Sequence, residues 1–410
     1  MQLRGIALAA LSIAFSVAAM ARRTRGRAAT SDGAADVAAT VLPSPPMDEP
    51  SPLCSAAEGS FSSTCKYALF IAILGLCTNT TEASGAAPSS LTTREPAIKA
   101  VELRWNRLAP YRAHGTFRFA VGHGGQAEIL RRIESVRARW TDDRGDTVFR
   151  FQTVYPEPYE RLLDFVDWKL IEMPFPRLQR LGRGDEERFL CECNWPAPVR
   201  RSVVTAYQEK APETFANLLA LKPGVADELV RLNGLPRPIS CREWAVRVAK
   251  LNALPEAGLE NFLFDVDRAS PSVGRKPLRD GQDDRCSYCG GRFIGGADVA
   301  ISFTGPRHGD NGLDNLVPAH GKCNNSKGDF LASAEHVERW TELSRRLDAD
   351  LAAVARECGW PRDRGRSTAV ARAVCLRLSA GARMWRGPDT LDSVDHTRFR
   401  RALVPVGHQR

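Results

Sequence analysis

The sequence predicts an α+β protein: a mainly helical N-terminal region, a small zinc-stapled module and a helical C-terminal tail. Three observations predict this architecture. Apolar residues recur at helical spacing through much of residues 96–275 and again through residues 333–410. Two pairs of metal-ligand residues bracket the short segment between those regions, at residues 276–332. The length of 410 residues exceeds that of a usual single domain.

Residues 1–95 are predicted to form a signal-like or disordered N-terminal extension. An apolar run at 6–19 precedes Ala19-Met20-Ala21, which is similar to a signal cleavage site, but four arginines follow within residues 22–27 and oppose translocation. Residues 22–95 are rich in Ala, Ser, Thr, Gly and Pro, a composition typical of disorder. The apolar runs, including 67–76, are shorter than the ~20 residues that span a bilayer. We expect no stable membrane insertion and a cytoplasmic location, with export or anchoring as the open alternative.

Residues 96–275 are predicted to be a mainly helical domain. The segments 116–121 and 147–154 alternate as strands do, and residues 126–140 between them carry a helical apolar stripe. Similar stripes predict helices at 159–170, 215–219, 225–232 and 259–264. Ser240 is a suitable N-cap for one more helix, whose inner face carries Trp244, Val248 and Leu251.

Residues 333–410 are predicted to be a helical tail. Ser333 can cap a helix whose apolar face runs from Val337 to Val354, and Gly359-Trp360-Pro361 would end it. Residues 369–378 are expected to form the last helix.

Charge and cysteine usage narrow the function class. A net charge of +9 and a pI near 9.1 suit a polyanionic partner, since each cation that replaces a counterion on a phosphate backbone adds affinity. The eleven cysteines are scattered along the chain. This pattern favours reduced thiols and one metal site over a disulfide framework.

The motif that carries chemistry is Cys286-Ser-Tyr-Cys289, followed after thirty residues by His320-Gly-Lys-Cys323. Two ligand pairs, each with two intervening residues, can close a tetrahedron around zinc. A module with so small a core needs such a staple, because metal binding then contributes folding free energy. The sequence therefore predicts a structural Zn²⁺ on these four side chains.

The strings "CSYCGG" and "GDNGLDNLVPAHGKCNNSKGDFL" resemble the HNH endonuclease domains of the ββα-metal superfamily. The resemblance is most specific over about fifty residues and extends loosely into Gly359-Trp360-Pro361. It implies a DNA endonuclease that hydrolyses phosphodiester bonds with a single divalent ion, Mg²⁺, Mn²⁺ or Ni²⁺. It also implies roles for particular residues: Asn315 as the mid-loop asparagine, Asn324 as a ligand of the catalytic ion, and Lys327 and Lys322 as nucleic-acid contacts.

The sequence departs from the family where the catalytic Asp-His pair is expected. The family's spacing puts this pair at Ala300-Ile301, and neither side chain can bind a hard cation or accept a proton. Three explanations stay open. The module binds nucleic acid through its zinc-dependent fold without catalysis; Asp298 as metal ligand and His308 as base substitute; or residues 300–306 carry a local sequence fault.

Overall fold

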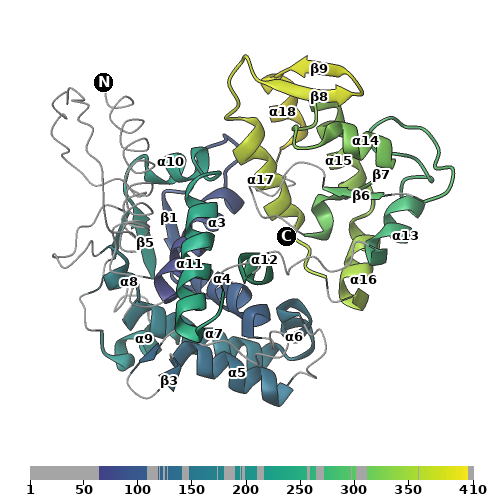
Figure 1. Ribbon diagram of the computed structural model, residues 1–410. Helices are drawn as coiled ribbons and strands as arrows, with labels where there is room; N and C mark the ends of the chain where they lie inside the picture. Colours follow the sequence, from purple (N-terminus) through teal and green to yellow (C-terminus); the bar gives the residue numbers. More distant parts are fainter. Residues whose placement is uncertain are drawn as a thin grey trace, which may run out of the picture.

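The computed structural model describes residues 64–404 apart from short internal segments. These segments are residues 109–118, 120, 123–124, 127, 141–146, 173, 180–189, 194, 196–198, 210–216, 256–258, 265–271, 297, 302–311 and 359. The described chain is mainly helical, with one three-stranded and three two-stranded sheets, all antiparallel. This is the α+β composition that the sequence predicts (Figure 1).

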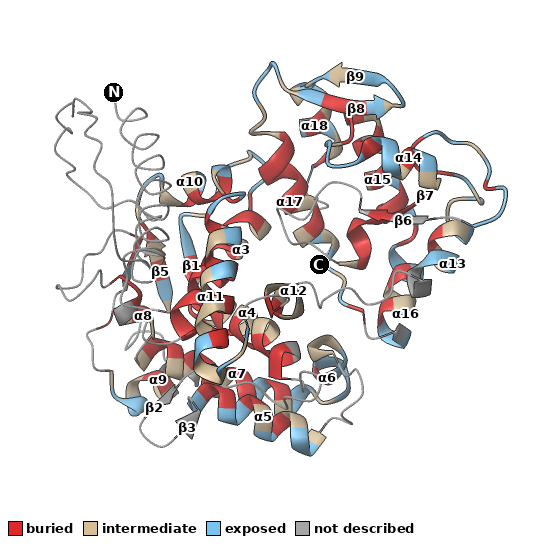
Figure 2. Cartoon of the chain, viewed as in Figure 1, coloured by how far each residue is buried: buried red, intermediate tan, exposed pale blue. Residues whose placement is uncertain are grey.

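Helix α3 (Thr64–Asn79) lies in the core of the N-terminal helical lobe. Its apolar side chains surround the whole helix and nearly all are buried, as in a core helix. Helices α4 (Arg94–Trp105), α10 (Val225–Arg231) and α11 (Pro236–Asn252) pack against it (Figure 2). The prediction of disorder is therefore wrong for residues 64–95, because an apolar segment too short for a bilayer is long enough for a core helix. The signal-like segment lies outside the described residues.

Further helices and small strands complete this lobe. The helices are α5 (Glu128–Trp140), α6 (Val148–Val154), α7 (Pro156–Glu172), α8 (Pro174–Leu178), α9 (Arg201–Gln208) and α12 (Leu259–Phe264), with the 3-10 turn Asn106–Leu108. The sheet order β1-β5-β4 joins β1 (Ser90–Thr92), β5 (Leu218–Leu221) and β4 (Cys191–Cys193), and β2 (Val121–Gly122) pairs with β3 (Gly125–Gln126). The helices predicted from the stripes at 126–140, 159–170, 225–232 and 259–264 are confirmed.

Three local predictions in this lobe are wrong. Residues 148–154 form α6, because the Thr147 hydroxyl accepts a hydrogen bond from the Arg150 amide at 3.1 Å and caps a helix. Residues 218–221 form β5, in which Leu219 and Leu221 are buried with the two-residue period of a strand. Ser240 lies inside α11, whose first turn begins at Pro236. Of the strand predicted at 116–121, residues 116–118 and 120 lie outside the described residues.

The candidate metal module follows helix α13 (Ser272–Asp280). Strand β6 (Asp298–Ile301) pairs antiparallel with β7 (Leu316–Ala319), and helix α14 (Gly321–Lys327) follows directly. A 3-10 turn at Leu313–Asn315 leads into β7. The module therefore has the order strand, strand, helix, with the four predicted ligands just outside the strands.

The C-terminal tail is not purely helical. Its elements are α15 (Ala334–Arg346), α16 (Asp348–Cys358), α17 (Arg364–Cys375), β8 (Arg383–Gly387), β9 (Thr390–Ser393) and α18 (His396–Ala402). The long helix predicted from Ser333 is therefore two helices, and residues 369–378 do not form the last one. The local pattern missed the β8–β9 hairpin, whose buried residues are the consecutive Met384 and Trp385 rather than alternating ones.

The tail and the metal module share one hydrophobic core. Buried residues of the module, such as Phe293, Val317 and Cys323, cluster with Trp340 of α15 and Phe399 of α18. The boundary predicted at residue 332 therefore separates two segments that fold against each other.

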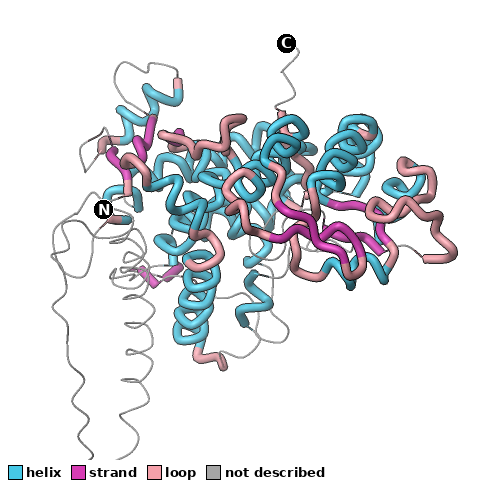
Figure 3. The backbone as a smooth tube through the Cα atoms, turned by 90° about the horizontal axis from the view of Figure 1, so that it is seen from above, coloured by secondary structure: helices cyan, strands magenta, loops and turns pink. Residues whose placement is uncertain are grey.

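Helix α17 joins this core to the N-terminal lobe. It packs against α3, and the buried Arg372 guanidinium donates to the carbonyls of Leu403 (2.7 Å) and Thr81 (3.2 Å). Figure 3 shows strands on both sides of the molecule with helices between them. In the part of the chain that the structure describes, no helix is long and apolar enough to cross a membrane.

Candidate metal centre and the loop beside it

The first ligand pair lies on a tight knuckle between two short extended segments. Arg285 and Arg292 form an antiparallel bridge at its base, and the Cys286 amide donates to the Gly291 carbonyl at 2.9 Å. The Gly290 amide donates back to the Cys286 carbonyl at 2.9 Å. Gly290 has φ +72°, a conformation that L side chains rarely adopt, so glycine is favoured there. The turn brings the two cysteine side chains to the same side.

The second ligand pair lies at the start of α14. His320 is the N-cap residue, with extended backbone (φ −66°, ψ 141°), and Cys323 lies in the first turn of the helix. A cap residue and the residue three positions later lie on the same face of the helix start. Strand β7 delivers this pair next to the knuckle, because the Ser287 amide donates to the Pro318 carbonyl at 2.9 Å.

The four side chains converge. The ligand atoms of Cys286, Cys289, His320 and Cys323 all lie within 4.8 Å of one another, and Cys289 Sγ is 3.3 Å from His320 Nδ1. Since a carbonyl only accepts hydrogen bonds, the 3.1 Å contact between His320 Nε2 and the Arg292 carbonyl places the ring proton on Nε2. The Nδ1 lone pair then faces the sulfurs, as a metal ligand requires. This cluster could hold a metal ion.

The pKa values of the cysteine thiols are shifted in ways that a bound cation would affect. Cys286 and Cys323 are buried, whereas Cys289 is exposed. Burial and the neighbouring thiols raise the pKa of Cys323 well above its usual value. Burial also raises the pKa of Cys289, but hydrogen bonds with the Gly291 backbone and His320 outweigh that effect and lower it to about 7. The raised pKa of Cys323 reflects the repulsion that its thiolate would meet from neighbouring sulfurs, and a bound cation would remove that repulsion.

Aromatic residues hold the knuckle in place. Phe293 packs edge-on against the His320 ring at 4.9 Å, and Arg279 lies over Phe293 at 5.1 Å. On the other side, Tyr288 contacts Trp385 of β8 edge-on at 5.1 Å. Arg339 of α15 donates to the Tyr288 carbonyl at 2.8 Å. The knuckle is therefore fixed by the tail as well as by its own turn.

The loop that carries Asn315 is buried. Asp314 and Asn315 are each 1% exposed. The Trp340 indole donates to the Asp314 carbonyl at 2.7 Å, and the Leu313 amide donates to the Pro361 carbonyl at 3.0 Å. Two partners from the tail thus fix the backbone on either side of Asp314, and they place Asn315 at the start of β7.

The β6–β7 register places the other predicted catalytic positions. Ile301 pairs with Leu316, next to Asn315, and Ala300 pairs with Val317. Ala300 is 2% exposed, so a methyl group fills the place expected for a metal-binding carboxylate. Asp298 pairs with Ala319 at the other end of the ladder, about 10 Å along the strand from Ile301. Asp298 thus lies opposite the residue that precedes the ligand His320, and not beside Asn315. His308 lies outside the described residues.

The predicted residues of α14 fall into two groups. Asn324 is partly exposed and Lys322 is exposed, so both can meet a ligand. Lys327 is only 6% exposed, its ammonium is 3.5 Å from the Gly328 carbonyl, and burial lowers its pKa. The prediction of Lys327 as a surface phosphate contact is therefore corrected: this side chain packs inward. Helical spacing from Cys323, four residues earlier on the buried face, is the signal that indicated this orientation.

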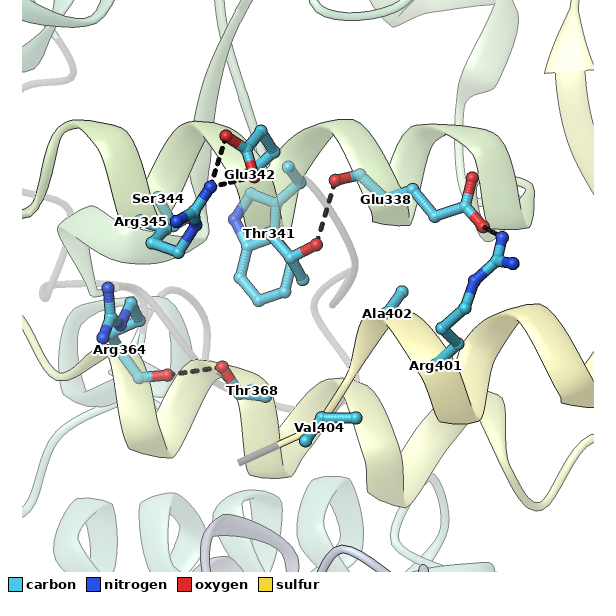
Figure 4. Close-up of a pocket in the computed structure, with 11 residues that line it drawn as sticks. Glu338, Thr341, Glu342, Ser344, Arg345, Arg364, Thr368, Arg401, Ala402 and Val404 are labelled. Carbon is cyan, nitrogen blue, oxygen red and sulfur yellow. Dashed lines mark hydrogen bonds and ion pairs between the residues drawn. The ribbon is translucent and has the colours of Figure 1, made fainter. Parts of the chain in front are cut away.

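A cavity of about 390 Å³ lies between α15, α17 and α18. Its charged lining residues already have partners: Arg401 pairs with Glu338 at 3.1 Å, and Arg345 pairs with Glu342 at 2.7 Å (Figure 4). The Trp340 ring contributes to its lining. The third lining arginine, Arg364, lies 3.7 Å from Asp348, so each lining arginine has an acidic partner and the cavity does not present an anion site.

Comparisons of the chain with protein-family models, with curated proteins and with solved structures return no match.

Proposed function

We propose that the metal at Cys286, Cys289, His320 and Cys323 is Zn²⁺ in a structural role. Three sulfurs and one imidazole nitrogen are the ligand set that zinc prefers, and a set of four protein ligands leaves no open position for substrate. The carbonyl of Arg292 that orients His320 is the kind of outer hydrogen bond that tunes such a site. The zinc would hold the knuckle against α14 and so maintain the ββα order.

The chain would act on DNA as an HNH-type endonuclease that hydrolyses phosphodiester bonds with one divalent ion. The observation that supports this best is the order β6, β7, α14 with the four ligands converging at its base. Asn324, directly after Cys323, would bind the catalytic Mg²⁺, Mn²⁺ or Ni²⁺, and Asn315 would hold the loop. The net charge of +9 suits a phosphate backbone as partner.

A second function is favoured by the buried Ala300 and by Ile301 beside Asn315. A module with this pair in place of a carboxylate and an imidazole has neither ligand nor base at that position. Such a chain would bind nucleic acid through the zinc-dependent fold without cleaving it.

We place the activity in the cytoplasm. The nine cysteines whose side chains the structure describes are free thiols, and four buried ones lie far from the metal cluster in sequence: Cys65, Cys77, Cys191 and Cys241. Thiols that stay reduced are typical of a reducing compartment.

A plasmid-nicking assay with Mg²⁺, Mn²⁺ or Ni²⁺ separates the two functions. For the endonuclease, the zinc-loaded protein nicks supercoiled plasmid, and Asn324→Ala lowers the rate by about 100-fold because a group that stabilises the transition state is lost. Zinc content stays unchanged in that variant. The matched control is Asn325→Ala, the exposed neighbour on the same helix, which should retain full activity.

The other outcomes are equally clear. No cleavage with any of the three ions, together with salt-sensitive retention on DNA, selects the binding protein. Equal activity of Asn324→Ala and Asn325→Ala removes Asn324 from the site. A protein that neither cleaves nor retains DNA contradicts both functions.

A further inference from the structure

Two arginines face each other across the base of the metal knuckle. Arg285 and Arg292 are direct partners in the antiparallel bridge, and both are exposed. Side chains directly opposite in such a pair have Cβ atoms about 4.5–5.5 Å apart, and like charges there destabilise the pairing. Among the described residues, neither arginine forms an ion pair with an acid. Among the described side chains, this pair of positive charges on the surface is therefore left without a neutralising acid.

The nearest acid in sequence does not relieve this repulsion. Asp284 accepts a hydrogen bond from Arg279 Nε at 2.7 Å and forms an ion pair with that residue. Arg285 itself donates to the neutral carbonyl of Gly290 at 3.0 Å. A neutral carbonyl orients the guanidinium without cancelling its charge. A polyanion placed against this surface would remove the repulsion.

Two more exposed side chains belong to the same module. Lys322 lies in the first turn of α14, two residues after His320, whose ring binds the Arg292 carbonyl. Ile294, two residues after Arg292, is 101% exposed. The next residue, Gly295, has φ +102° and its carbonyl accepts from Arg279 at 3.0 Å. This loop thus presents a fully exposed apolar side chain two residues after Arg292.

We propose that this knuckle face, formed by Arg285, Arg292, Ile294 and Lys322, is the surface through which the protein contacts duplex DNA. The three cations contact phosphates, and Ile294 packs against sugars and base edges in the groove, where apolar side chains are inserted by proteins that deform a duplex. The inference rests on the proposed action on DNA. It replaces Lys327, which is buried, with residues that a duplex can reach.

A competing role for the two arginines is charge compensation at the metal. Three thiolates around Zn²⁺ leave one net negative charge, which nearby guanidinium groups would offset. This role predicts that removing the arginines releases zinc. The experiment therefore measures zinc content and DNA affinity on the same preparations.

The test uses the full zinc-loaded chain and a labelled random-sequence DNA duplex. Affinity is measured by fluorescence anisotropy between about 50 and 200 mM salt. The double variant Arg285→Gln/Arg292→Gln should bind about tenfold more weakly and lower the slope of log affinity against log salt by about 2. The variant Ile294→Ser should weaken binding without changing that slope. The matched control is Arg242→Gln/Lys250→Gln, which removes the same charge from exposed positions of α11 and should leave both quantities unchanged.

Several results would overturn the proposal. An equal loss of affinity in the control variant would show that net charge alone is responsible. Loss of zinc from the knuckle variant would assign the arginines to the metal. Equally tight, equally variant-sensitive binding of polyglutamate would replace DNA with an acidic protein. If the unaltered protein binds no duplex, the proposed function fails; if it binds and the knuckle variant binds equally well, only this surface fails.

Discussion

Arg362 holds the fully buried carboxylate of Asp314 with two hydrogen bonds, Nη2 to Oδ1 at 2.9 Å and Nε to Oδ2 at 3.2 Å. The two residues are 48 positions apart in the chain. The same guanidinium donates to Asp348 Oδ1 at 2.6 Å, so it ties the start of α16 to the loop that carries Asn315. The tail beyond residue 333 is therefore a structural part of the candidate site.

We predict that Arg362→Ala destabilises the protein by about 3 kcal/mol, because it removes the guanidinium that binds both oxygens of the buried Asp314 carboxylate. Urea unfolding followed by tryptophan fluorescence measures this loss. The variant Arg362→Lys should recover only part of it, since an ammonium cannot reproduce the two-pronged contact.

The control for this prediction is Asp348→Ala. Asp348 is half-exposed, at 53%, and its pairing with Arg362 is screened by water, so its removal should cost below about 1 kcal/mol. Equal losses from Arg362→Ala and Asp348→Ala would show that the buried carboxylate does not depend on Arg362.

We predict that Cys289→Ala lowers bound zinc from one ion per chain to almost none, because an incomplete tetrahedron loses most of its affinity. Elemental analysis of the purified protein measures the metal. The knuckle should then become accessible to limited proteolysis near residues 285–295. Cys193→Ala, a change in strand β4 of the other lobe, should leave the zinc content unchanged, and full zinc in Cys289→Ala would contradict the assignment.

We predict that Asp167→Asn stabilises the protein above pH 6. Asp167 is 0% exposed, and burial raises its pKa from 3.8 to about 6, against smaller opposing effects of Thr93 and Arg94. Because the pKa is raised in the folded state, the carboxyl group contributes its full stabilisation below pH 3.8. That contribution is lost as the pH rises through about 6. Asparagine keeps a neutral side chain at every pH, so the gain should reach about 2–3 kcal/mol at pH 8.

The pH profile of thermal unfolding checks the sign of this effect. The difference between Asp167→Asn and the unaltered protein should shrink as the pH falls from 6 to about 4. Asp164→Asn, on the same helix, removes the carboxylate that binds Arg94 at 2.7 Å near the surface and should give no gain. A pH-independent difference for Asp167→Asn would refute the role of its ionisation.

We predict that the stability contribution of His336 changes with pH in the opposite direction. Burial lowers its pKa below the ordinary 6.5, and its Nε2 donates to the Arg386 carbonyl at 3.0 Å while the ring stacks on Trp385. The unfolded chain therefore binds more protons, so stability falls as the pH drops below 6.5 toward the lowered folded value. His336→Gln should reduce this acid loss between pH 7 and pH 5, as measured by urea unfolding. An identical pH profile in the variant would assign the acid sensitivity to other groups.

Local patterns predicted the helices and the metal cluster well. The stripes of α5, α7 and α10 are amphipathic, so the spacing of their apolar residues alone identifies them. Helix α3 was missed because it is apolar on all sides and has no such periodicity. Strand β5 was missed because a four-residue run gives too short a pattern to separate strand from helix.

The sequence by itself determined the metal cluster, because each ligand pair is local: two residues between the cysteines of the knuckle and two between His320 and Cys323 fix their geometry within one turn. Only the tertiary structure decided that Arg362 binds Asp314 and that Arg285 faces Arg292 on an exposed surface. Such facts depend on packing between segments far apart in the chain, and residue spacing carries no information about which distant side chain will cover or neutralise another.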